Sequence, residues 1–147
     1  MTSEQTVAST PFTAAECYRL LEHHAVGRIC ITDQDGPLTL PVSYRILGPV
    51  TAPYVVLRTA PTTTLGRYSG LGALEVDEIN EDERRAVSVL ARGVLRPIDG
   101  PHELPDPQPW VTDGRDQWMV LNIRTMSGRR FVVSNNPDGF AVEWQFG

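Results

Sequence analysis

Residues 28–46, RICITDQDGPLTLPVSYRI, decide the fold class of this chain. Residues 28–32 are mostly apolar and predict a strand, and the Asp-Gln-Asp-Gly sequence that follows is typical of a tight turn. From residue 39 to 46, apolar and polar residues alternate, which predicts a strand with one buried face. The apolar face would carry Leu40, Val42, Tyr44 and Ile46, and the other face Thr39, Pro41, Ser43 and Arg45. The stretch therefore predicts two strands joined by a turn.

More strands are predicted towards the C-terminus, each bounded by turn or loop residues. They are residues 54–59, 73–77, 86–95, 118–124 and 129–133. Gly93 suggests a bulge, and Ser127-Gly128 suggests a turn. The charged connection 78–85 is expected to be a solvated loop, and five prolines between 97 and 110 exclude a long helix there. Six or seven evenly spaced strands predict an antiparallel barrel rather than βαβ winding.

One or two short helices complete the prediction. Residues 13–16, Thr-Ala-Ala-Glu, have the spacing of a capping box, so an amphipathic helix is expected to begin there and to end by Val26. A second, shorter helix is expected through residues 65–68, with Thr62 or Thr63 as its cap.

A chain of 147 residues is long enough for one domain with its own core. Residues 1–11 are polar and are expected to form a flexible N-terminal arm. Residues 12–134 would form the barrel domain, and residues 135–147 a C-terminal extension. Apolar residues alternate in this extension, which would either add a last strand or cover a partner chain.

Composition excludes several functions. All 13 basic residues are arginine, which excludes a lysine Schiff base and a P-loop lysine, and the net charge of −5 argues against nucleic-acid binding. No apolar run approaches the ~20 residues of a membrane span, and no secretory signal is recognisable. Two cysteines and three scattered histidines form no metal-binding motif. The chain is therefore expected to be cytoplasmic, without a metal and without a membrane partner.

The strongest candidate site for chemistry is the segment from Arg58 to Leu65, RTAPTTTL. It places one guanidinium and four hydroxyl groups at a junction between a strand and a short helix, and these donors suit an oxyanion. A threonine-capped turn beside an exposed arginine would have the same sequence, so both interpretations stay open. The acidic run from Glu75 to Glu83 is expected to be a solvated face without chemistry.

Several short motifs, in order between residues 13 and 131, resemble the pyridoxamine 5′-phosphate oxidase-like proteins, and in particular their short actinobacterial-type members. The motifs are ECYRLL (16–21), VGRI (26–29), PVSY (41–44), LRTAP (57–61), LEVD (74–77), SVLARG (88–93) and GRDQW (114–118). The resemblance implies a mainly β fold, a six-stranded antiparallel split β-barrel with one or two short helices. It also implies a homodimer that holds FMN, or the deazaflavin F420, in a groove at its interface.

The resemblance also assigns roles to twelve residues. Arg58, Thr59, Thr63 and Thr64 would hold the flavin phosphate; Pro41, Val42, Ser43 and Tyr44 would follow the edge of the ring; Val87, Ser88 and Val89 would lie under it; Trp118 would contact it from the same or the second subunit. No catalytic acid or base is assigned. Arg28 and Tyr44 are expected to be polar groups near the pocket.

Three departures from the family pattern bear on function. Thr62-Thr63-Thr64 stands where relatives commonly have Gly-Ser-Lys or Gly-Thr-Lys, Val87 stands where they often have Trp, and the proline-rich segment 97–109 replaces a helix. Three functions therefore stay open. The first is an FMN- or F420-dependent oxidoreductase acting on a small molecule. The others are a non-catalytic carrier or sensor of flavin, heme or another small ligand, and an enzyme of specialised metabolism that uses the groove without flavin.

Overall fold

The computed structural model describes residues 6–99, 103–111 and 114–134. Within these residues the chain forms seven strands, one α-helix and one turn of 3₁₀ helix. In chain order they are β1 (Thr6–Pro11), α1 (Ala14–His23), β2 (Val26–Asp33), β3 (Gly36–Leu47), β4 (Tyr54–Thr59), η1 (Leu65–Arg67), β5 (Gly70–Asn80), β6 (Arg85–Ile98) and β7 (Gln117–Ser134). The mainly β class is confirmed. The predicted extension 135–147 lies outside the described residues.

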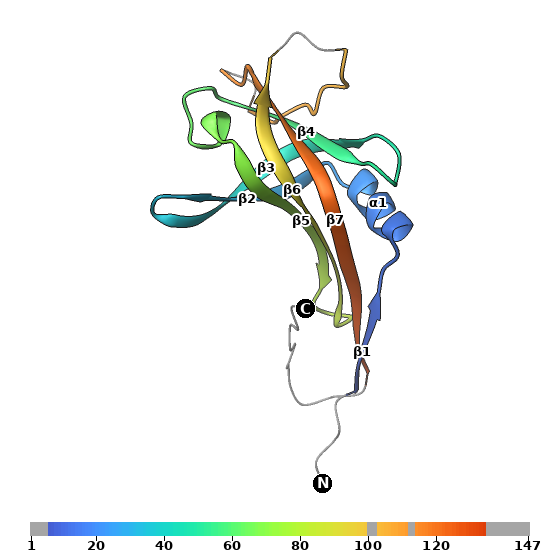
Figure 1. Ribbon diagram of the computed structural model, residues 1–147. Coiled ribbons are helices and arrows are strands. Elements are labelled where there is room, and N and C mark those ends of the chain that lie inside the picture. Colours follow the sequence, from blue (N-terminus) through green and yellow to red (C-terminus); the bar gives the residue numbers. More distant parts are fainter. Residues whose placement is uncertain (1–5, 100–102, 112–113, 135–147) are drawn as a thin grey trace.

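Six of the strands close into a ring. The order is β7-β4-β3-β2-β5-β6, all neighbours are antiparallel, and pairing of β6 with β7 completes the circle (Figure 1). The predicted six-stranded antiparallel split barrel is confirmed. β1 is a seventh strand, paired to the free side of β7 from Thr6↔Ser134 to Pro11↔Arg129. Residues 6–11 are therefore part of the sheet, and the prediction of a flexible arm is wrong for them.

The prediction of two strands separated by a turn at Ser127-Gly128 is also wrong. β7 runs through this dipeptide without interruption, because β6 pairs with it on both sides, at Leu90↔Ser127 and Val89↔Gly128. Gly128 serves close packing instead. A Cβ atom there would lie 2.8 Å from the Phe12 ring and 3.0 Å from the Ser88 carbonyl oxygen. The glycine thus lets the segment before α1 approach the sheet.

The charged connection after residue 77 is shorter than predicted. β5 continues to Asn80, and Glu78, Ile79 and Asn80 pair with the first residues of β6. All three side chains, including that of the apolar Ile79, are exposed at one end of the barrel, so strand pairing does not require their burial. Only residues 81–84 form the turn between the two strands, where the Asn80 side chain accepts a hydrogen bond from the Glu83 amide at 3.0 Å.

α1 covers the sheet and contributes to the core. Its N-terminus is capped as predicted, because the Thr13 side chain accepts from the Glu16 amide and the Glu16 side chain accepts from the Thr13 amide. The helix ends at His23, three residues before Val26, because the Ala25 carbonyl already accepts a strand bond from the Tyr44 amide at 2.9 Å. Fully buried side chains fill the barrel interior. They include Cys17, Leu21, Ile29, Leu57, Leu74, Val89 and Leu121.

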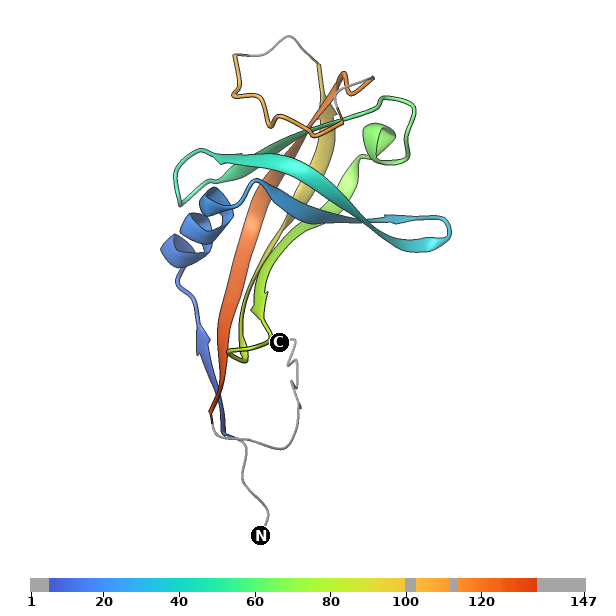
Figure 2. The ribbon, with the colours of Figure 1, turned by 180° about the vertical axis from the view of Figure 1, so that it is seen from behind.

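One end of the barrel gathers the ends of β4, β6 and β7 and the connections beside them. Both η1 and the described part of the connection between β6 and β7 lie at this end, seen from either side (Figures 1 and 2). The predicted lack of a long helix in this connection is confirmed over residues 103–111. This arrangement places the Arg58 region, near the end of β4, directly against the proline-rich segment.

Gly93 supports the predicted bulge and gives a test of the fold. The register of β6 against β7 shifts between Arg92 and Gly93, and a Cβ on Gly93 would lie 1.8 Å from the Asn122 carbonyl oxygen. Because that contact is with backbone, Gly93→Ala is expected to lower the free energy of unfolding by about 3 kcal/mol, measured by urea denaturation.

Gly72→Ala is the matched control, since Gly72 pairs with Gly93 on the adjacent strand. A Cβ on residue 72 would lie close only to the Leu95 side chain, at 3.2 Å. Gly72→Ala is therefore expected to lower the free energy of unfolding by less than about 1 kcal/mol. Equal losses in the two variants would contradict the role assigned to the bulge.

Candidate functional site

Arg58 is held in a fixed position near the end of β4. It pairs with Trp118 of β7, and its guanidinium carbon lies 5.7 Å from the centre of the Trp118 ring. Its side chain is only 20% exposed. Stacking on an aromatic face and partial burial both limit the rotamers of the guanidinium, so the donor group points consistently towards the connection between β6 and β7.

The donors of Arg58 already bind an oxyanion. Nη1 donates to both carboxylate oxygens of Asp106, at 3.1 and 2.9 Å, and Nε donates to the Arg115 carbonyl oxygen at 3.0 Å. The hydrogen bond from the Gln108 amide and then the Arg58 guanidinium hold the pKa of Asp106 below its usual range. The exposed arginine of the alternative interpretation is therefore not observed, because the guanidinium is partly buried and paired with a carboxylate of the same chain.

The threonines beside Arg58 mainly shape their own loop. Thr59 is buried, and its Oγ1 lies 3.4 Å from Oγ1 of Thr63. The Thr63 hydroxyl donates to the Ala60 carbonyl oxygen at 2.7 Å and accepts from the Gly66 amide at 3.0 Å. Thr64 is the N-cap residue of η1, but its side chain makes no capping hydrogen bond and is exposed. Thr63 thus stabilises the turn through the Gly66 amide, as the capping interpretation expected.

Residues 41–44 lie on β3, and they differ in accessibility. Pro41 is exposed, and Val42 and Ser43 are half-buried. Tyr44 is 1% exposed, and its hydroxyl donates to the Leu21 carbonyl oxygen at 2.6 Å. Burial raises the pKa of Tyr44 well above its ordinary value. The Tyr44 hydroxyl is therefore a structural link between β3 and α1, whereas Pro41 and Ser43 remain accessible for contact.

A single chain does not bring all twelve predicted residues together. Trp118 pairs with Ile98 at one end of β6, whereas Val87 pairs with Arg130 near the other end. Ser88 and Ile98 are ten residues apart, which is up to about 33 Å of strand. Val89 is buried in the core, and Val87 and Ser88 are half-buried. Arg58, Thr59, Thr63, Thr64 and Trp118 form one group, and residues 87–89 lie far from it.

Residues 41–44 lie between the two groups, because Tyr44 pairs with Leu57, the neighbour of Arg58, while a row of strand pairs leads from Pro41 towards residues 87–89. Arg28 pairs with Pro41 on one side and with Glu75 on the other, and Glu75 pairs with Leu90. One row across β3, β2, β5 and β6 therefore joins Pro41 to Leu90, over about 14 Å at the usual strand spacing. Arg28 lies at the middle of this row.

The sequence model of the pyridoxamine 5′-phosphate oxidase family matches residues 13–130. The chain belongs to this family. Among curated proteins, none matches the chain. None of the helices in the described part of the chain combines the length and apolar character needed to cross a bilayer.

Several solved structures have a similar fold. A FAD-binding protein from Mycobacterium smegmatis is 25% identical, with a TM-score of 0.65 over 84% of this chain and 99% of its own. A conserved protein of unknown function from Corynebacterium diphtheriae is 23% identical, with a TM-score of 0.68 over 84% and 98%. A FAD-binding protein from Mesorhizobium loti is 16% identical, with a TM-score of 0.64 over 86% and 98%.

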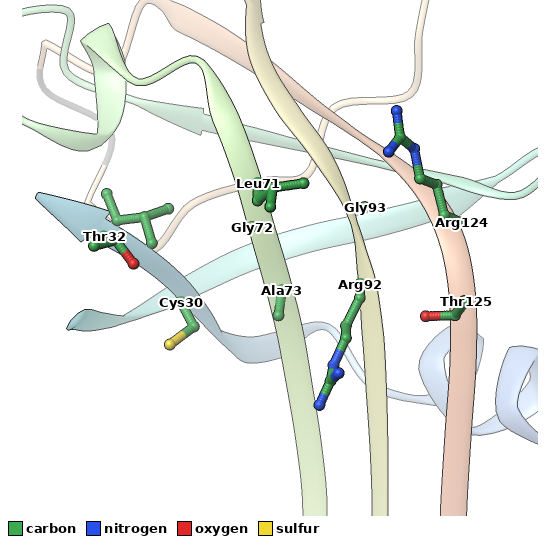
Figure 3. Close-up of a pocket in the computed structure, with 10 residues that line it drawn as sticks. Cys30, Thr32, Leu71, Gly72, Ala73, Arg92, Gly93, Arg124 and Thr125 are labelled. Carbon is green, nitrogen blue, oxygen red and sulfur yellow. The ribbon is translucent and has the colours of Figure 1, made fainter.

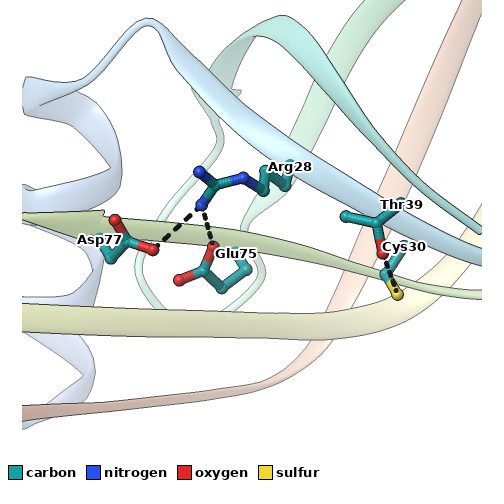
Figure 4. Close-up of polar contacts among 5 residues, drawn as sticks. All are labelled: Arg28, Cys30, Thr39, Glu75 and Asp77. Carbon is teal, nitrogen blue, oxygen red and sulfur yellow. Dashed lines mark hydrogen bonds and ion pairs between the residues drawn. The ribbon is translucent and has the colours of Figure 1, made fainter.

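Sequence analysis missed a charged cluster on the outer face of this family fold. Arg28 Nη1 donates to Glu75 Oε2 at 3.4 Å and to Asp77 Oδ2 at 3.1 Å (Figure 4). The prediction of a solvated acidic run is wrong for Glu75 and Asp77, because both side chains are less than one-third exposed. Their spacing of two residues in a strand, on either side of apolar Val76, was the signal that they share one face.

Glu75 titrates near neutral pH. Burial, followed by the hydrogen bond and the charge of Asp77, raises its pKa to about 7, although Arg28 acts in the opposite direction. The nearby carboxylate makes a second negative charge unfavourable at short range. Glu75 is thus a side chain in the row between Pro41 and Leu90 that can gain or lose a proton under ordinary cellular conditions.

The outer face also has a cavity of about 390 Å³ across β2, β5, β6 and β7. Its lining includes Cys30, Leu71, Arg92, Arg124 and Thr125, and the Arg92 and Arg124 side chains point in opposite directions along their strands (Figure 3). None of the twelve predicted residues lines this cavity. Val87 instead lines a separate cavity of about 530 Å³, together with charged residues at the far end of β5 and β6.

The residues present fit the phosphate end of a flavin at one position. Arg58 presents two donor nitrogens to the adjoining connection, and one of them already binds both oxygens of a carboxylate. Thr59 and Thr63 fit less well, because their hydroxyls take part in contacts within their own loop. Of the four residues predicted to hold the phosphate, Arg58 therefore suits an oxyanion best.

The raised pKa of Glu75 predicts a dependence of stability on pH. Folding favours the protonated form of Glu75. The stabilisation that this carboxyl group contributes below about pH 4.5 is therefore lost as the pH rises towards 7. Glu75→Gln removes this titration. Between pH 5 and 8, the wild-type protein is expected to lose about 1–2 kcal/mol of unfolding free energy relative to Glu75→Gln, since partial exposure moderates the effect.

Urea denaturation at the two pH values measures this difference. Glu83→Gln is the control, because the Glu83 and Arg85 side chains form an ion pair at 3.7 Å while both remain more than half exposed. Identical pH dependence in the wild type and in Glu75→Gln would refute the assignment.

Proposed function

We propose that the protein is a flavin-binding oxidoreductase of small molecules, with Arg58 holding the phosphate-bearing end of the cofactor at the interface of a homodimer. The observation that carries the proposal is the Arg58 guanidinium, whose Nη1 binds both oxygens of one carboxylate beside Trp118. Membership of the pyridoxamine 5′-phosphate oxidase family supports it. FAD joins FMN and F420 as a candidate, because the similar Mycobacterium smegmatis structure is a FAD-binding protein.

The separation of the predicted residues supports a site shared by two copies. Within one chain, Trp118 and Ser88 lie on distant parts of the β6–β7 ladder. A ring system in contact with both residue types would need Ser88 from one copy and the Arg58–Trp118 pair from the other. If this protein bound the cofactor as a monomer, that result would contradict the shared site.

When bound, the flavin would supply hydride or electron transfer. The residues of the chain would bind and orient it. Arg58 neutralises phosphate charge, and the Trp118 ring keeps the guanidinium in place. The exposed Pro41 and half-buried Ser43 would contact the ring edge from β3. The Glu75 carboxyl group, which changes protonation near neutral pH, can hold a proton on the same row of residues.

A carrier or sensor without turnover is the second candidate. It is favoured because the donors of Arg58 and Thr63 already bind oxygen atoms of the same chain. A ligand that must displace these contacts binds reversibly and with moderate affinity. Reduction of a dye by the reconstituted protein with NADPH or reduced F420 would support the oxidoreductase. Bound flavin without such reduction would support the carrier.

The absorption spectrum and mass of the small molecule that co-purifies test the proposal directly. A flavin spectrum, or its appearance on soaking with FMN, FAD or F420, is the expected result. A colourless dimer that takes up none of the three would overturn the proposal and favour a function without flavin.

Arg58→Ala is expected to weaken binding of the flavin phosphate at least about tenfold, because it removes a charge-assisted contact. Fluorescence titration with FMN measures the change. Arg19→Ala on the exposed side of α1 carries the same charge change and is expected to bind as the wild type does. Equal affinities in all three proteins would contradict the assignment of Arg58.

A further inference from the structure

We propose that Asp106 is an internal competitor for the anion site at Arg58, and that it selects dianionic phosphate ligands over monoanionic carboxylates. The inference rests on the proposed role of Arg58. The Asp106 carboxylate binds the guanidinium. A phosphate would displace it and release the segment 103–111 from Arg58.

The exposures of the two partners identify which one can leave. The Asp106 side chain is 50% exposed, whereas that of Arg58 is 20% exposed. Arg58 is also held by the Arg115 carbonyl oxygen and by the Trp118 ring. The guanidinium therefore stays in place when the pair separates, and the carboxylate can rotate into solvent, where water hydrates it.

The local backbone around Asp106 forms a compact turn. Oδ1 of Asp106 accepts a hydrogen bond from the Gln108 amide at 2.9 Å, and Gln108 has a φ of +52°. Residues other than glycine adopt this left-handed conformation at a cost. The Asp106 carboxylate supports the turn and binds Arg58 at the same time, so loss of the Arg58 contact is expected to loosen Gln108 as well.

Charge decides which ligands can compete. A carboxylate ligand carries the same charge as Asp106 but lacks the advantage of being tethered beside Arg58, so it is at a disadvantage. A phosphate monoester carries nearly two negative charges at neutral pH and three acceptor oxygens. Arg45 adds a second positive charge that acts on Asp106 from β3, and this charge also favours the dianion.

Asp106→Asn tests the competition, because it keeps the shape and the acceptor for Gln108 while it removes the charge. Titrations with FMN and with riboflavin, which lacks the phosphate, separate the phosphate contribution from the ring. We expect Asp106→Asn to bind FMN roughly fivefold more tightly than the wild type and to bind riboflavin equally. Asp116→Asn, an exposed aspartate in the same connection, is the matched control and should change neither affinity.

Hydrogen exchange measured by mass spectrometry gives a readout that does not depend on flavin. Saturating inorganic phosphate should accelerate amide exchange in residues 103–111 of the wild type, and should have no such effect in Arg58→Ala. In Asp106→Asn these amides should exchange faster before phosphate is added. Unchanged or slower exchange in the wild type on addition of phosphate would overturn the inference.

The outcomes separate this inference from the proposed function. If Arg58→Ala weakens FMN binding but Asp106→Asn leaves it unchanged or weakens it, the flavin site stands and the competition is refuted. If FMN binds to none of the variants but phosphate still releases residues 103–111 through Arg58, the competition stands and flavin binding is refuted. Tighter binding of both FMN and riboflavin to Asp106→Asn would also refute the competition, since the effect would not involve phosphate.

Discussion

The continuity of β7 is the constraint on which the rest of the structure depends. This one strand, Gln117–Ser134, pairs with β4 along its first part, with β1 along its last part and with β6 along most of its length. It therefore closes the ring and also attaches the segment before α1. Because Trp118 is at its beginning, the same strand sets the position of the ring on which Arg58 stacks. An interruption of β7 would affect closure, the helix and the candidate site together.

The parts of the fold that depend on local sequence could be predicted. The alternation in residues 39–46, the capping box at Thr13 and the bulge at Gly93 all reflect chemistry within a few residues of the feature. The errors arose where distant segments decide the outcome. Ser127-Gly128 has the composition of a turn, but its pairing with β6 and the approach of Phe12 keep it extended. Likewise, residues 6–11 are ordered by β7 and not by their own pattern.

The candidate site shows the same division. The sequence leaves two interpretations of Arg58 open, an anion site and an exposed arginine beside a capped turn, and the ion pair with Asp106 rules out the second. Asp106 itself could not be predicted as the partner, since it lies 48 residues further along in a proline-rich connection without periodicity. Glu75 and Asp77 could have been recognised from their spacing of two residues in a strand, but the acidic residues that follow them conceal this signal. The separation of residues 87–89 from Trp118 is a property of strand length that no motif contains.

The two cysteines of the chain differ in a way that makes the outer face of the sheet open to labelling. Cys17 is fully buried on the inner face of α1, and burial raises the pKa of its thiol, so it is protected from alkylating reagents. Cys30 is partly exposed, with its sulfur 3.4 Å from the Thr39 hydroxyl at the edge of the cavity of Figure 3. A maleimide fluorophore or spin label would therefore attach at one defined position without mutagenesis. Distances between two such labels would report how two copies of the chain are arranged in solution.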